Sequence, residues 1–453
     1  MLTAALGDSA ALAGPPLVDP GRLPANAEPA PRDPTEQKTR CWETVPADAG
    51  SAPDSGQRQL DVASAWQFTR GAGQTVAVID TGVARHPRLP GLIGGGDYVS
   101  DTDGTDDCDV HGTIVAGIIA ASQVDGQVFS GVAPQARIIS LRQSSSHWQV
   151  AGRSAQQQPE DVADGYGNTT TMAAAVRHAA DLGATVINIS EVACSTGQMG
   201  DAALGAALEY ATVRKNVVVV AAAGNNDRCP AGNPGIDPLH PDANPWDRVT
   251  TIVSPAWYDD YVLTVGSIDT NGAASKFSVP GPWVDVAAPG ENIVSLDPRR
   301  PGLTGGKIDE KGQTEQFAGT SFAAPYVAGT AALVRARFPH LSAQQVIARI
   351  EATAHAPAHG WNPSVGFGVI DPYAALTAEV PPGTPSKQPT RAAAVELAAP
   401  PAAAAPDHRG RDRALIGAAC IAVLLVLGLL ASYPLRRRYR MTEAAESDRT
   451  LVP

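Results

Sequence analysis

Short runs of consecutive apolar residues recur between residues 61 and 378 of the chain. We expect these runs to form strands at TVAVI (75–79), ARIISL (136–141), TVINIS (185–190), VVVVAA (217–222) and YVLTVGS (261–267). Strands that are apolar at successive positions, and not only at alternate ones, are typical of a sheet covered on both faces. The pattern therefore predicts a buried sheet in this part of the chain.

Segments with helical spacing lie between the predicted strands. TTMAAAVRHAADLG ends on Gly183 and DAALGAALEYATVRKN ends on Asn216, and both residue types commonly follow the last turn of a helix. Ser342 and Gln345 form a capping-box signature at the start of a further helix, SAQQVIARIEATA. This alternation of strands and helices predicts an α/β domain over residues 61–378, with a doubly wound parallel sheet and helices on both faces.

Three polar or proline-rich segments break this rhythm. Residues 142–168 and 226–259 are predicted surface loops, and loops of such length often line a cleft or bind a partner. Residues 15–60 are rich in Pro, Ala and Asp and show no periodicity. We expect them to form an extended N-terminal arm, with a flexible linker as the alternative.

The C-terminal part of the chain predicts a membrane anchor. Residues 379–413 are a Pro/Ala-rich linker, and residues 414–433 supply the roughly 20 uncharged residues that cross a bilayer. A buried core helix is the alternative, which the position and flanks of this segment disfavour. Four arginines follow the segment, whereas arginines and aspartates are mixed before it, so we expect the tail, 434–453, in the cytoplasm and the α/β domain outside.

Export of the domain also accounts for the N-terminus and the cysteines. Residues 1–14 are rich in small residues and are interpreted as the remnant of a secretory signal. Of five cysteines, Cys420 lies in the apolar C-terminal run, which leaves Cys41, Cys108, Cys194 and Cys229. These four show no CxxC spacing, so two disulfides in an oxidising compartment are favoured over a zinc or thioredoxin-like site.

Composition and charge exclude some classes of ligand. Hydrophobic residues make up 43% of the chain, enough for a sizeable core, and the formal net charge is -12. A chain without a basic field repels phosphate backbones, so we expect no nucleic-acid partner. The segment DTDGTDD (101–107) is acid-rich, but a solvated loop is favoured over a calcium site. We therefore expect neither a metal nor a cofactor.

Candidate chemistry lies at the predicted strand ends and helix starts. Asp80 directly follows TVAVI, at the sheet edge where such folds build their sites, although D-T-G is equally typical of a turn. His111, in DVHGTIVAGIIA, precedes an apolar helical run, although single histidines are more often structural. Each of these two motifs taken alone is a weak indication of function.

Ser321 lies in FAGTSFAAPYVAGTAALV, where a Gly-Thr-Ser turn leads into an Ala-rich helix with Pro325 near its beginning. Unpaired N–H groups at that helix start would favour an oxyanion next to the serine, once a base has taken the serine proton. Asn225, in VVVVAAAGNND, ends another strand and is a second candidate donor to the same oxyanion, or an ordinary turn residue.

DTG, HGTxVAG, AAAGN and GTSFAAP occur together and in this order, which makes coincidence remote. In this combination residues 61–378 resemble the subtilase family of serine proteases. The resemblance implies that Asp80 orients His111, that His111 acts as base and then acid, and that Ser321 is the nucleophile. It further implies that Asn225 and the Ser321 N–H form the oxyanion hole. A sedolisin-type site, with Glu in place of His111, is disfavoured.

The same resemblance implies that two strand ends flank the substrate, and their binding residues would be Ser190, Glu191, Val192 and Gly224. Glu191 and Val192 stand where many subtilases have small glycines, so the resemblance fixes no substrate preference. Cys194 and Cys229 follow these segments closely. Among three possible pairings we therefore favour Cys194 with Cys229, which would staple the cleft wall, and Cys41 with Cys108, which would tether the arm.

The order of arm, core, linker, apolar helix and Arg-led tail is similar to that of mycosins, the membrane-bound subtilases of type VII secretion systems. This resemblance covers nearly the whole chain. It implies protein or peptide substrates, an arm that wraps the core, and a secretion membrane complex as partner. Two hypotheses follow, an endopeptidase for exported proteins and a structural subunit whose proteolysis is dispensable or narrowly targeted. A pure binding module would require the four motifs to be accidental.

Overall fold

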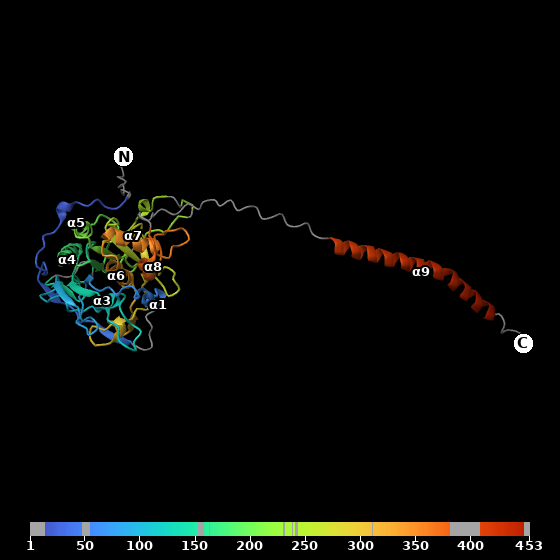
Figure 1. Ribbon diagram of the computed structural model, residues 1–453, viewed down its shortest axis with the longest axis horizontal. Helices are drawn as coiled ribbons and strands as arrows, with labels where there is room; N and C mark the ends of the chain where they lie inside the picture. Colours follow the sequence, from blue (N-terminus) through green and yellow to red (C-terminus); the bar gives the residue numbers. More distant parts are fainter. Residues whose placement is uncertain are drawn as a thin grey trace, which may run out of the picture. The chain divides into compact units, whose positions relative to one another are not determined.

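The computed structural model describes residues 14–47, 55–152, 158–162, 164–229, 232–237, 239–240, 243–309, 311–380 and 408–447. The chain divides into two compact units, Met1–Arg391 and Ala392–Pro453. The larger unit contains the sheet and the helices that surround it (Figure 1). The smaller unit contains one long helix, α9 (Arg409–Ser447).

The central sheet has seven strands, all parallel, and confirms the predicted doubly wound α/β fold. Its order is β12 (Val284–Pro289), β11 (Val262–Ile268), β9 (Val218–Ala222), β7 (Val186–Ile189), β3 (Thr75–Asp80), β5 (Arg137–Arg142) and β4 (Ile93–Asp97). The five apolar runs of the sequence coincide with β3, β5, β7, β9 and β11.

Successive residues of each central strand enter two different cores. In β3, Val76 and Val78 pack into the core that contains α3 (His111–Ala120) and α6 (Thr320–Arg337). Ala77 and Ile79 pack into the opposite core, with α4 (Thr169–Asp181) and α5 (Ala202–Glu209). Because both faces of the sheet are covered, both sets of positions must be apolar, which explains the uninterrupted runs.

The predicted helix ends and starts are present. Gly183 and Asn216, with φ of 83° and 58°, adopt the left-handed conformation that ends helices. Beyond α5 the chain continues as a π-helical turn, η2 (Tyr210–Arg214). Ser342 and Gln345 close the capping box of α7 (Ala343–Thr353). Three further helices complete the unit: α1 (Ser55–Gln59), α2 (Val62–Ala65) and α8 (Pro372–Thr377).

The N-terminal arm is extended between residues 14 and 47, apart from one turn, η1 (Pro20–Arg22). Its strand β1 (Thr35–Gln37) pairs with β6 (Trp148–Val150), and β2 (Glu43–Ala47) pairs with β14 (Leu303–Ile308). Pairing with the domain excludes a flexible linker for these residues. The end of the expected arm differs from the prediction, because Ser55–Gln59 form α1.

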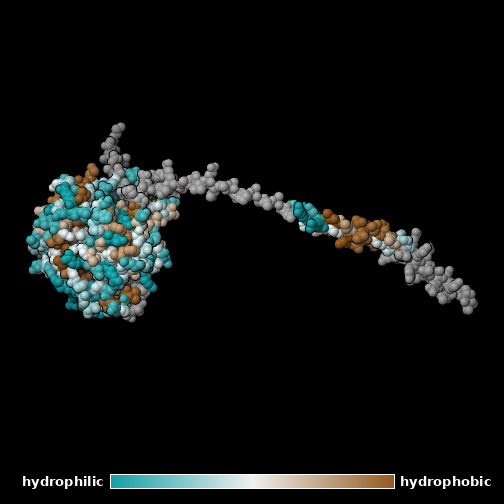
Figure 2. All heavy atoms as spheres, in the orientation of Figure 1, coloured by the Kyte–Doolittle hydropathy of each residue, from teal (hydrophilic) through white to brown (hydrophobic). Residues whose placement is uncertain are grey.

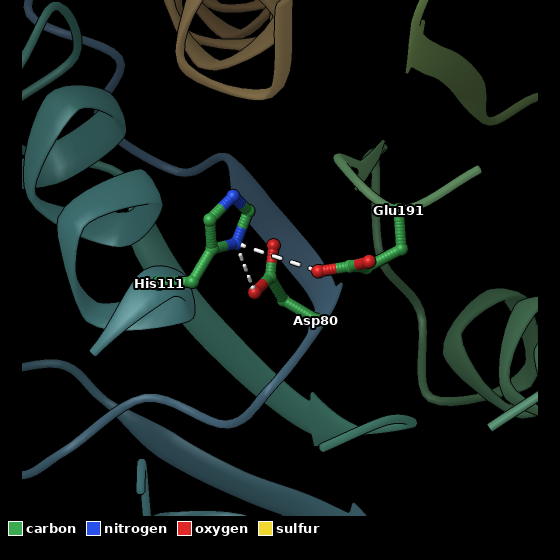
Figure 3. A group of neighbouring side chains, drawn as sticks. All are labelled: Asp80, His111 and Glu191. Atoms are coloured by element: carbon green, nitrogen blue, oxygen red, sulfur yellow. Dashed lines mark hydrogen bonds and ion pairs between the residues drawn. The ribbon is translucent and has the colours of Figure 1, made fainter. Parts of the chain in front are cut away.

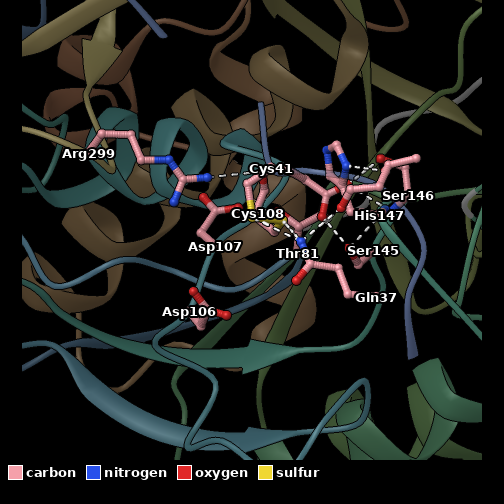
Figure 4. The surroundings of a disulfide bond; sticks show 12 residues. Gln37, Cys41, Thr81, Asp106, Asp107, Cys108, Ser145, Ser146, His147 and Arg299 are labelled. Atoms are coloured by element: carbon pink, nitrogen blue, oxygen red, sulfur yellow. Dashed lines mark hydrogen bonds between the residues drawn. A yellow bond between two sulfur atoms is a disulfide. The ribbon is translucent and has the colours of Figure 1, made fainter. Parts of the chain in front are cut away.

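The disulfide Cys41–Cys108 ties this arm to the domain, and Figure 4 shows its surroundings. The Trp42 N–H donates a hydrogen bond to the Cys108 carbonyl at 3.1 Å, and the Arg299 side chain donates to the same carbonyl at 3.2 Å. Both the pairing and the tethered arm agree with the expectation from the sequence.

Within the expected loops, short strands form by pairing with distant segments. Residues 142–168 contain β6, and residues 226–259 contain η3 (Pro245–Arg248) and β10 (Ile252–Ser254). β10 pairs with β8 (Ala193–Ser195). Two more short strands, β13 (Ser295–Leu296) and β15 (Thr314–Gln316), flank β14 in a second sheet.

The helix of the smaller unit is long enough and apolar enough, by length and composition, to cross a membrane. Its candidate span is Arg409–Pro434, in which a window of 18 residues has a mean hydropathy of 2.8 and is 0% buried. Figure 2 shows its apolar side chains exposed. The helix begins at Arg409, before the expected residue 414. Residues 409–413, which were expected to belong to the linker, are therefore part of the helix. Residues 1–13, 381–407 and 448–453, with most of the expected signal remnant and linker, lie outside the described residues.

Candidate active site

The predicted site residues converge on one cleft at the carboxyl edge of the sheet. Asp80 ends β3, the pair Gly224 and Asn225 follows β9, and the segment 190–192 follows β7. His111 is the first residue of α3, and Ser321 is the second residue of α6. A cavity of about 230 Å³ is lined by His111, Ser190, Glu191, Val192, Gly224, Asn225 and Ser321. Parallel strands all end at one edge, which explains how residues so far apart in sequence meet.

Asp80 and His111 form the central hydrogen bond of the site. His111 Nδ1 lies 2.7 Å from Asp80 Oδ1 (Figure 3). The same oxygen accepts the Thr81 N–H at 2.7 Å. The Asp80 side chain is 0% exposed and that of His111 is 21% exposed. A buried carboxylate at Nδ1 fixes the orientation of the ring and stabilises its protonated form, and it leaves Nε2 as the nitrogen available for proton transfer.

The start of α3 is held by a tight backbone arrangement. Val110, the residue before His111, has φ of 68°, a strained value for a β-branched residue. A Cβ on Gly112 would lie 2.1 Å from the Gly82 carbonyl oxygen, so only glycine fits there. The glycine of the His-Gly-Thr motif therefore allows the start of α3 to approach the Gly82 carbonyl closely.

Asp107 and Thr81 brace the same helix start. Asp107 accepts hydrogen bonds from the Thr113 N–H at 2.9 Å and from the Thr81 hydroxyl at 2.9 Å. The Thr81 hydroxyl in turn accepts the Gly112 N–H at 3.0 Å. Burial raises the pKa of Asp107 to about 7, against the Thr113 hydrogen bonds that lower it. These supporting contacts link β3 to α3, and no sequence motif indicated them.

Ser321 is fixed by a contact that crosses the cleft. Pro325 is four residues further along α6 and has no N–H, so the Ser321 carbonyl lacks the usual helical partner. The Ser190 hydroxyl donates to that carbonyl at 2.8 Å, and Asn188 Nδ2 donates to Ser190 at 2.9 Å. Pro325 therefore costs the helix a hydrogen bond, and the Ser190 hydroxyl replaces it. The Ser190 hydroxyl is thus engaged with the Ser321 backbone, and Ser190 also lines the cleft.

Asn225 is oriented by Thr320. Its Oδ1 accepts hydrogen bonds from both the N–H and the hydroxyl of Thr320, each at 3.0 Å. With the oxygen so occupied, the amide nitrogen faces the opposite way. A Cβ on Gly319 would lie 3.2 Å from Asn225 Nδ2 and 3.0 Å from Ser321 Oγ, so the two groups border the same space. The Ser321 N–H, in the first turn of α6, has no carbonyl one turn earlier to bond.

Glu191 places a second carboxylate beside the histidine. Its Oε1 lies 3.7 Å from His111 Nδ1, and its side chain is 16% exposed. Burial works to lower the pKa of His111, but the charge and hydrogen bond of Asp80, with contributions from Glu191 and Asp107, raise it to about 9. Burial raises the pKa of Glu191, the charge of His111 opposes this shift, and Asp80 adds to it. Sequence reasoning marked Glu191 as an unusual cleft residue but did not indicate its contact with His111.

Asp80, His111 and Glu191 also carry the donor types of a metal site, since one atom of each lies within 4.8 Å of the others. Two carboxylate oxygens and one imidazole nitrogen are ligands that zinc accepts. The hydrogen bond between Asp80 and His111 already uses two of these three atoms. The geometry is thus that of an acid–base pair with an additional anion.

A disulfide joins the segments that follow β7 and β9. Cys194 pairs with Cys229, as expected from the sequence. At Gly224, a Cβ would lie 3.2 Å from Cys229 Sγ and 3.6 Å from Val192 Cγ2. The Gly224 N–H donates to the Thr320 hydroxyl at 3.1 Å. These contacts join the segment after β9 to the start of the serine helix.

Known proteins share this arrangement. Residues 71–368 match the model of the subtilase family. Mycosin-4 of Mycobacterium tuberculosis is 48% identical over 94% of this chain and 91% of its own length. This chain belongs to the subtilase family and, within it, to the mycosins. It is a subtilisin-like serine endopeptidase.

More distant and solved relatives agree with this membership. Thermitase of Thermoactinomyces vulgaris is 33% identical to this mycosin over 67% of the chain and 89% of thermitase. The MycP3 protease from the type VII (ESX-3) secretion system, whose structure is known, is 44% identical in sequence to this chain. Its structure superposes with a TM-score of 0.76 and covers 81% of this chain and 100% of the MycP3 chain. A chain in the structure of an intact ESX-5 inner membrane complex is 43% identical, with a TM-score of 0.77 over 92% of this chain and 98% of that one.

Proposed function

We propose that Asp80, His111 and Ser321 hydrolyse peptide bonds as a catalytic triad. The observation that carries this proposal is the hydrogen bond of 2.7 Å between buried Asp80 and His111, in a cleft that Ser321 also lines. His111 takes the Ser321 proton as Oγ attacks the peptide carbonyl, and Asp80 stabilises the imidazolium that forms. His111 then protonates the leaving amine, and water hydrolyses the acyl-enzyme by the same steps.

Asn225 Nδ2 and the Ser321 N–H form the oxyanion hole in this proposal. Support comes from Thr320, which holds the oxygen of the Asn225 amide and so directs its nitrogen toward the space beside Ser321. Two fixed donors stabilise the negative oxygen without the reorganisation that water would need. The substrate strand would lie between residues 190–192 and Gly224, because both segments line the cleft.

A fluorophosphonate probe tests the nucleophile, because it reacts covalently with activated serines. We expect the full-length protein to be labelled and Ser321→Ala to abolish labelling. Ser64→Ala, which changes a serine in α2 outside the cleft, serves as the matched control and retains the label. Labelling that survives in Ser321→Ala would refute the assignment.

For the setting of this activity, we infer a membrane-bound place in a type VII secretion complex, with exported proteins as substrates. The observation in favour is the similarity, over 92% of this chain, to a chain of an intact ESX-5 inner membrane complex. A related structure is described as the periplasmic assembly of that complex, which supports an extracytoplasmic catalytic domain. Helix α9 would be the anchor, and the arginines after it favour a cytoplasmic tail.

A structural role in the complex is the second candidate, and the similarity of this chain to chains of the ESX-5 inner membrane complex favours it. The two roles separate in the producing organism. If the chain also stabilises the complex, type VII export persists with Ser321→Ala and stops when the whole gene is deleted. Loss of export in both strains would contradict the structural role.

A further inference from the structure

Glu191 has no task in the triad mechanism, yet it contacts the catalytic base. Figure 3 shows the Asp80 and Glu191 side chains directed at the same ring nitrogen of His111. A triad needs one carboxylate at Nδ1, which Asp80 supplies at 2.7 Å. The second anion, at 3.7 Å, is too distant for a hydrogen bond but close enough for a strong charge interaction.

The other charged groups around His111 and Glu191 do little to offset the negative charge of Glu191. Asp107 and Asp109, from the segment before α3, add negative charge, and the α6 side contributes the apolar Phe322 ring, 4.9 Å from the His111 ring. Arg228, from the segment after β9, is the cation that acts on Glu191. Its guanidinium is directed at Asp164, 3.1 Å away. Among the described residues, Glu191 forms its ion pair with His111.

We propose that Glu191 is a positioning residue that holds His111 as an imidazolium in the free enzyme and thereby restrains its basal activity. This inference rests on the proposed role of His111 as the general base. The base must be neutral to take the Ser321 proton, whereas a carboxylate beside the ring stabilises the protonated form. A second carboxylate therefore reduces the share of enzyme that is ready to react.

The geometry also explains why the effect is large above neutral pH, where Glu191, whose pKa burial raises to about 7, carries its charge. One oxygen each of Asp80 and Glu191 lies within 4.8 Å of the other and of the ring nitrogen, and the second oxygen of Asp80 is buried and has no hydrogen-bond partner among the described residues. Negative charge concentrated in a poorly solvated site is best balanced by the imidazolium. Consistently, the pKa of His111 is raised to about 9, so activity should rise as the pH increases through this region.

The pH dependence of fluorophosphonate labelling tests the proposal without knowledge of the natural substrate. We expect Glu191→Gln, in the full-length protein, to move the midpoint of the rise in labelling rate down by about one pH unit or more. Near neutral pH this shift corresponds to about tenfold faster labelling. Glu209→Gln is the matched control, because Glu209 is also 16% exposed but pairs with Arg214 outside the cleft. It should leave the midpoint where the parent has it.

Glu191→Asp is the second variant, since it keeps the charge and moves it away from the ring. We expect a midpoint between those of the parent and Glu191→Gln. If Glu191→Gln does not fold, the midpoint of Glu191→Asp alone tests the proposal. An unchanged or higher midpoint, or the same shift in Glu209→Gln, would overturn the proposal. Labelling that does not depend on Ser321 would instead overturn the triad, so the two failures are distinguishable.

Discussion

The two sides of His111 differ in how their carboxylates are held. On the Asp80 side, comprising residues 80–82 and 107–113, the carboxylate is fully buried and accepts a backbone N–H besides the ring. On the Glu191 side, comprising residues 188–194, the carboxylate is 16% exposed and lies 3.7 Å from the same nitrogen. Asp80 ends β3 and Glu191 follows β7, and these two strands are neighbours in the central sheet.

Two carboxylates that lie close to the same catalytic base can therefore have different roles. Asp80 is rigidly hydrogen-bonded, so it can orient the ring and stabilise the imidazolium during the reaction. Glu191 contributes charge without a hydrogen bond, so it changes how often the ring is protonated more than where the ring points. Substitution of the two acids should therefore change activity in opposite directions.

The largest effect is expected for Asp80→Asn. An amide at this position can hold the wrong tautomer of His111, and the rate of labelling should fall by about 10⁴-fold. Asp201→Asn changes another buried aspartate, 2% exposed and outside the cleft, and its folded fraction should keep the parent rate. If Asp80→Asn and Glu191→Gln both accelerated labelling, or both slowed it equally, the distinction between the two sides would be wrong.

A smaller loss is expected for Asn225→Ala. Removal of one donor to the oxyanion should lower the rate of labelling by about 10²- to 10³-fold, without a change in its pH midpoint. Asn226→Ala is the control, because this neighbouring side chain instead donates to the Lys276 carbonyl at 2.7 Å. A loss no greater than that of the control would remove Asn225 from the oxyanion hole.

The smallest effects concern the hydroxyls that brace each side. Thr81→Val leaves the Gly112 N–H without its acceptor, and Ser190→Ala leaves the Ser321 carbonyl without its donor. Each should lower the free energy of unfolding by about 1–3 kcal/mol, measured by urea unfolding with tryptophan fluorescence. Stability equal to that of the parent in both variants would show that these contacts do not brace the site.

The sequence sufficed to predict the features that depend on local pattern. The strands β3, β5, β7, β9 and β11, the caps at Gly183 and Asn216, and the capping box of α7 follow from periodicity and residue type. The residues proposed for the triad lie at strand ends and helix starts, so the order of the motifs placed them at one sheet edge.

Contacts between distant segments could not be predicted in the same way. The strands β1, β2, β6, β8 and β10 form by long-range pairing and have little apolar pattern of their own. The distance between Glu191 and His111 depends on a side-chain direction that no spacing encodes. Pro325 was a signal that could have been used, since a proline four residues after Ser321 implies a carbonyl in need of another donor.

The site of covalent modification shows whether Ser321 is the nucleophile that His111 activates. The full-length protein would be treated with a fluorophosphonate at alkaline pH, where His111 is neutral, then digested and mapped by mass spectrometry. We expect one adduct, on Ser321, which is lost in His111→Ala. An adduct on a different residue, or no adduct in the folded protein, would contradict this expectation.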